Sequence, residues 1–76
     1  MSRNEPTAAM RKYLNVLKEI DPSGRGIRSI EVARALQVSR SSVHTMMDRL
    51  SEMGYINKEH YGIVYLTEKG LAAAAE

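Results

Sequence analysis

Apolar residues recur at helical spacing along the first part of the chain. They are Met10, Tyr13, Leu14, Leu17 and Ile20, which fall on one face of a helix. Thr7 is a suitable N-cap, because its hydroxyl can accept a hydrogen bond from an amide of the first turn. The helix should end before Pro22, since the segment DPSGRG at residues 21–26 has the composition of a turn.

A short strand and a second helix are predicted next. Ile27 and Arg28 fit the strand, and Ser29 is a natural cap for a helix that begins at Ile30 and stops near Gln37. The apolar side of this helix consists of Ile30, Val32, Ala33 and Leu36.

Only about three residues separate this helix from a third one over residues 39–53. Ser39 can cap the third helix, whose apolar face carries Val43, Met46, Met47 and Leu50. Two helices joined so tightly must cross steeply, and the small side chain of Ala33 suits the crossing point. The pattern therefore predicts a helix-turn-helix.

Extended segments follow the third helix. Gly54 suits the helix end, and residues 55–66 predict a β-hairpin that turns at His60, Tyr61 and Gly62. Thr67 can cap a last, alanine-rich helix. The predicted fold is mainly α with a small β-hairpin wing, in the α+β class: a winged helix-turn-helix over residues 7–76, preceded by a flexible N-terminal arm at residues 1–6.

Length and composition restrict the function. A chain of 76 residues cannot house both a core and a large substrate pocket, and it contains no membrane span or signal peptide, so we expect a cytoplasmic protein. It has no cysteine, His44 and His60 lie on different elements, and no Ser/His/Asp set or glycine-rich phosphate loop can be assembled. We therefore expect no enzyme activity, no cofactor and no metal.

Positive charge is concentrated in one part of the chain. Residues 22–47 contain four arginines and one glutamate, a net charge of +3, whereas the other residues sum to −1. Such a local field attracts phosphate, although exposed arginines also serve solubility. Because the first turns of a recognition helix lie nearest the base edges in the major groove, the pattern favours binding to double-stranded DNA.

Ten residues are predicted to contact the DNA. They are Arg28, Ser39, Arg40, Ser41, Ser42, His44, Thr45, Arg49, Lys58 and Tyr61. Ser39 has the alternative role of a helix cap, and the other serines that of solvent-exposed residues. Arg28, Arg49 and Lys58 would hold phosphates, while Tyr61 lies on the wing. Lysine on an exposed hairpin can also simply protect its edge.

Two carboxylates oppose this interpretation. Asp48 and Glu52 share the exposed face of the third helix with Ser41 and Thr45, and a carboxylate there repels phosphate. Either they lie too far along the helix to matter, or Asp48 orients a neighbouring arginine. The alternative function is a winged-helix module that binds a protein instead of DNA, which the modest net charge of +2 also favours.

The stretch SIEVARALQVSRSSVHTMMDRLSEMGYINKEHYGIVYLTEKG, Ser29 to Gly70, resembles a known DNA-binding domain. It is similar to the N-terminal domain of metal-dependent repressors of the diphtheria-toxin-repressor and manganese-transport-regulator type, in its SSV, its GY, the Y and G of its wing and its closing LT-KG. With the preceding MRKYLNVLKEI, the likeness covers roughly residues 7–72. The multiple-antibiotic-resistance regulators share the helix-turn-helix and the LTEKG ending.

Two departures from that family qualify what the resemblance implies. Its members carry acidic metal ligands on the first helix, where this chain has Lys12 and Asn15. The chain also ends at Glu76, before the remaining ligands and the helical domain through which those repressors dimerise. The resemblance therefore implies a DNA-reading head without a metal sensor, and DNA binding independent of metal. The first or the last helix could supply a homodimer contact.

Overall fold

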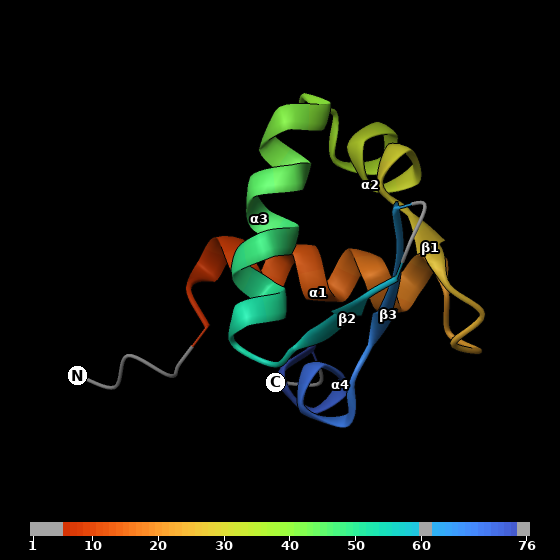
Figure 1. Cartoon of the computed structure of the whole chain (residues 1–76), viewed down its shortest axis with the longest axis vertical. Helices are drawn as coiled ribbons and strands as arrows, with labels where there is room; N and C mark the ends of the chain where they lie inside the picture. The colour runs from red at the N-terminus through yellow and green to blue at the C-terminus, as the bar shows by residue number, and fades with distance from the viewer. Residues whose placement is uncertain (1–5, 60–61, 75–76) are drawn as a thin grey trace.

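The computed structural model describes residues 6–59 and 62–74, and Figure 1 shows their arrangement. Their elements are α1 (Ala8–Ile20), β1 (Ile27–Arg28), α2 (Ser29–Leu36), α3 (Arg40–Glu52), β2 (Ile56–Lys58), β3 (Ile63–Leu66) and α4 (Glu68–Ala74). This order confirms the predicted winged helix-turn-helix. The predicted arm, apart from Pro6, and the predicted turn residues His60 and Tyr61 lie outside the described residues.

Helix α1 runs behind the other elements and forms one wall of the core (Figure 1). Thr7 caps it as predicted, because the Thr7 hydroxyl accepts a hydrogen bond of 3.1 Å from the Met10 amide. Leu14 and Leu17 of its apolar face are fully buried, whereas Ile20, the last residue of the helix, is 37% exposed.

Among the described residues, every helix is too short or too polar to span a membrane.

The start of α2 differs from the prediction. The helix begins at Ser29, and Arg28 is its N-cap residue. The extended backbone of Arg28 pairs with Ile63 of β3, and its amide donates a 3.0 Å hydrogen bond to the Glu31 carboxylate. Pairing in the sheet thus moves the helix start back by one residue, and Ser29 is not the cap. Ile30, predicted to be buried, is then 37% exposed.

The tight connection between α2 and α3 is confirmed. Gln37 ends α2 in the left-handed conformation with a φ of 56°, and the amide of Val38 donates to the carbonyl of Ala33 over 3.1 Å. In Figure 1, α2 is seen nearly end-on while α3 stands upright, so the two helices cross steeply. Ala33 is buried, as the prediction for the crossing point requires.

The three strands form one antiparallel sheet in the order β1-β3-β2. Ile27 pairs with Val64, and Ile56 pairs with Leu66. Ile27, Ile56 and Val64 are buried, so one face of the sheet closes the helical core. Strands β2 and β3 are the two arms of the predicted wing, residues 55–66.

The start of α4 is held against the end of α3. The Thr67 hydroxyl accepts a 3.0 Å hydrogen bond from the Gly70 amide, as predicted for a cap, and donates one of 2.6 Å to the Gly54 carbonyl. The Lys69 ammonium donates to the Met53 carbonyl over 2.7 Å and lies 4.8 Å from the centre of the Tyr55 ring. These contacts give the LT-KG and GY segments a shared structural role: they fix where α3 ends.

Candidate nucleic-acid interface

Helix α3 presents a polar face to solvent and is anchored by an apolar one. Val43, Met47 and Leu50 are buried in the core, and Met46 packs partly buried against it. The polar face is exposed throughout, at Ser41, His44, Thr45, Asp48, Arg49 and Glu52. The prediction of which side of α3 faces outward is therefore confirmed.

The first turn of α3 uses two of its serines internally. The Ser39 hydroxyl caps the helix by accepting a 3.1 Å hydrogen bond from the Ser42 amide. It also donates to the Ser42 hydroxyl over 2.9 Å. Both side chains are exposed. Ser39 and Ser42 therefore act as a pair that orders the turn, and Ser41 is left to face outward between them.

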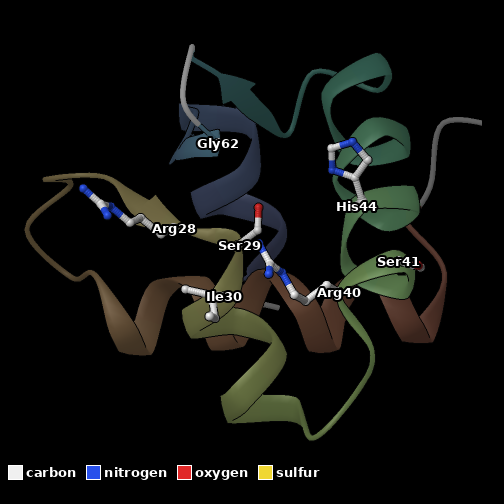
Figure 2. A pocket seen from close by; sticks show the side chains of 7 residues that line it. All are labelled: Arg28, Ser29, Ile30, Arg40, Ser41, His44 and Gly62. Atoms are coloured by element: carbon white, nitrogen blue, oxygen red, sulfur yellow. The ribbon is translucent and has the colours of Figure 1, made fainter.

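A hollow of about 540 Å³ lies beside the start of α3. It is lined by residues of β1, α2, α3 and the wing: Arg28, Ser29, Ile30, Arg40, Ser41, His44 and Gly62. Figure 2 shows the Arg40 side chain extending from α3 toward the first turn of α2, while the Arg28 guanidinium points outward from the opposite side. We call this the basic hollow, because its lining contains two arginines, Arg28 and Arg40, and no acidic residue.

The basic hollow joins residues that are far apart in the chain. Arg28, Arg40, Ser41 and His44 were predicted to contact DNA, and the fold places all four in its lining. Ser29, Ile30 and Gly62 were not predicted as contacts. The sequence pattern makes Ser29 a cap and puts Ile30 in the core, because no local signal shows that Arg28 pairs with Ile63 in the sheet and is itself the N-cap of α2.

The other predicted contact residues do not line the hollow. Thr45 and Arg49 lie further along the exposed face of α3. Lys58 lies on β2 of the wing, where its ammonium forms an ion pair and hydrogen bond with the Asp48 carboxylate of α3. Asp48 therefore orients a lysine of the wing and not a neighbouring arginine. Tyr61 lies outside the described residues.

The ion pair changes the acidity of Asp48. The hydrogen bond from Lys58 holds the pKa of the Asp48 carboxyl below its ordinary value; the charges of Lys58 and His44 act in the same direction, and desolvation opposes them. A carboxyl whose pKa is lower in the folded state than in the unfolded state stabilises the fold at pH values above its ordinary pKa. That contribution is lost as the pH falls through the lowered value.

Replacing Lys58 with methionine is expected to return the pKa of Asp48 toward its ordinary value, because the hydrogen bond and the nearest positive charge are both removed. The carboxyl carbon shift of Asp48, followed by NMR through an acid titration, measures this change. Lys18→Met removes an exposed lysine from α1 and should leave the Asp48 titration unchanged. An identical Asp48 titration in Lys58→Met and in the unmodified protein would contradict the ion pair.

The fold and its exposed α3 define a winged helix-turn-helix domain of the DNA-binding class. Residues 6–64 match the model of the iron dependent repressor N-terminal DNA binding domain. The chain belongs to this family. An uncharacterized HTH-type transcriptional regulator of Methanocaldococcus jannaschii is 38% identical over 55 residues, which are 72% of this chain and 44% of that protein.

Solved structures share the fold of this chain. The reduced form of MarR from E. coli superposes with a TM-score of 0.78 at 28% identity, over 91% of this chain and 48% of MarR. ScaR with bound Zn²⁺ gives a TM-score of 0.72 at 29% identity, over 87% of this chain and 30% of ScaR. The chain thus spans about half or less of the length of these relatives.

The name of the family implies iron, which the residues on α1 do not fit. Lys12 and Asn15, at the positions where the resemblance puts acidic ligands, are both exposed. An ammonium group repels a cation and a neutral amide is a weak ligand for iron. Across residues 6–59 and 62–74, no three His, Asp or Glu side chains are grouped so that they could hold a metal ion.

Proposed function

We propose that this domain binds double-stranded DNA sequence-specifically, with α3 in the major groove and the wing against the neighbouring backbone, as part of a transcriptional regulator. The observation that carries the proposal is the basic hollow. It sets Arg40 at the start of α3 opposite Arg28 of β1, beside the helix turn that would enter the groove. The family membership of residues 6–64 supports the same function.

The chemistry of the α3 surface suits a close approach to DNA. The major groove is about 12 Å wide and admits one helix. Small serines at the first turn let the helix backbone come near, and Arg40 is long enough to reach a guanine edge or a phosphate. Ser41, His44 and Thr45 would face base edges, while Arg28, Arg49 and Lys58 would contact phosphates. Tyr61 remains a predicted wing contact.

The regulator would act as a homodimer in the cytoplasm. Palindromic sites require two heads about one helical turn apart. The exposed face of α1 or the alanine-rich α4 would supply the contact between copies. Nothing in the proposal requires catalysis or a metal ion. The whole of residues 7–76 would serve as one DNA-binding unit.

Selection from random DNA duplexes tests the proposal directly. We expect a recovered consensus with two-fold symmetry. Binding to it should weaken steeply with salt: two heads with three phosphate contacts each would lose about 10³-fold in affinity between 50 and 200 mM salt. An affinity that is independent of salt, or no binding to any duplex at low salt, would contradict DNA binding and favour a protein partner.

A further inference from the structure

The ion pair between Asp48 and Lys58 links the two elements that would face the DNA. Asp48 lies on the exposed side of α3 and Lys58 on β2 of the wing, with side chains that are 53% and 31% exposed. The pair is ten residues apart in sequence and depends on the wing packing beside α3. Its position explains why an acidic residue stands on a face that otherwise favours DNA.

We infer that Asp48 is a specificity-determining residue that acts as an internal substitute for a DNA phosphate. The Asp48 carboxylate binds the Lys58 ammonium, as a DNA phosphate would. While this ion pair is formed, Lys58 does not contact the DNA backbone. This inference rests on the proposed function and adds to it. The ion pair weakens the contact between the wing and the backbone of any duplex, whatever the sequence of that duplex.

A DNA phosphate can take the place of the Asp48 carboxylate beside Lys58 for an electrostatic reason. Exposed ion pairs are weak, so a phosphate can displace Asp48 when other contacts hold the DNA in place. Binding to random DNA depends almost wholly on phosphate contacts, so the loss of one lysine contact lowers that affinity by the whole contribution of the contact. Binding to the selected site also uses contacts with base edges. Asp48 therefore weakens binding to random DNA more than binding to the selected site.

The test replaces Asp48 with asparagine, which keeps the shape of the side chain and removes its charge. Affinities for a random-sequence duplex and for the selected site are measured between 50 and 400 mM salt. For the random duplex we expect, for each bound head, about tenfold tighter binding at 50 mM salt and a salt slope steeper by about 0.9, because each head neutralises one more phosphate. The ratio of specific to nonspecific affinity should fall.

Two controls separate the action of Asp48 through Lys58 from a general charge effect. Glu52→Gln removes the same charge from the same exposed face of α3, and the described residues give Glu52 no ion pair. Its salt slope should match that of the unmodified protein. In a Lys58→Met background, Asp48→Asn should leave the slope unchanged, because the lysine that it would release is absent. Thermal unfolding establishes that each variant is folded.

The possible results separate a failure of this inference from a failure of the proposed function. An Asp48→Asn variant with unchanged or weaker affinity for random DNA would overturn the inference while the proposed function stands. So would an equal gain with and without Lys58, which would show a general effect of charge. If the unmodified protein binds no duplex at low salt, the proposed function fails first and the inference fails with it.

Discussion

Replacing Gly70 with alanine is expected to lower the free energy of unfolding by about 3 kcal/mol, the upper end of the range for overpacking. A Cβ atom at this position would lie 2.0 Å from the Tyr55 carbonyl oxygen and 3.0 Å from a methyl carbon of Leu66. The closest of these atoms belongs to the backbone, which cannot move aside as a flexible side chain can. The variant must therefore separate α4 from the segment that follows α3.

The expected sign is opposite to that from helix propensity alone. Gly70 lies inside α4, and alanine in a helix interior is favoured over glycine by about 1 kcal/mol. Urea unfolding followed by circular dichroism measures the difference. The matched control is Gly24→Ala, where a Cβ would meet no atom within 4 Å and only the left-handed φ of 73° opposes alanine. That control should cost about 1–2 kcal/mol. Equal stability of Gly70→Ala and the unmodified protein would refute the close packing at Tyr55.

Arg40→Ala is expected to weaken binding to the selected DNA site by about 1–3 kcal/mol for each recognition helix, which is about fivefold to 150-fold per helix. Arg40 is the first residue of α3, and its side chain extends into the basic hollow (Figure 2). Alanine removes the fork of donors that could reach a guanine edge or a phosphate. The fold should persist, because Arg40 is exposed and the Ser39 cap does not use its side chain.

Fluorescence anisotropy with a labelled duplex measures this loss. Arg34→Ala is the matched control, since Arg34 is an exposed arginine in the last turn of α2 and does not line the hollow. It should change the affinity little. If Arg40→Ala and Arg34→Ala bind the selected site equally well, α3 does not enter the groove by its first turn and the assignment of the recognition surface is wrong.

Much of the fold could be predicted because its determinants are local. Thr7, Ser39 and Thr67 each cap the helix that follows them, and a cap needs only residues within one turn. The apolar face of α3 follows from helical geometry in the same way. The local pattern is wrong about Ser29 as the cap and about the burial of Ile30, because strand pairing between Arg28 and Ile63, across 35 positions of sequence, decides where α2 begins.

The candidate site could be predicted only in part, for the same reason. Helical periodicity identifies the exposed side of α3, and therefore Ser41, His44 and Thr45, without knowledge of the rest of the fold. Periodicity cannot show which residues of β1, α2 and the wing lie opposite that side. The charge of Arg28 predicts a phosphate contact, but the position of Arg28 across the hollow from Arg40 is a property of the folded chain.

Local spacing and capping chemistry were thus sufficient for the order of the elements, the buried faces of α1 and α3 and the winged helix-turn-helix architecture. Contacts between distant segments decided three other features: the basic hollow, the packing of Gly70 on Tyr55, and the partner of Asp48. The physical reason is that each needs two elements in a particular relative position, which the packing of the core and the antiparallel sheet determine. Asp48 is unfavourable for DNA binding when α3 is considered alone, and Lys58 becomes its partner once the wing packs beside that helix.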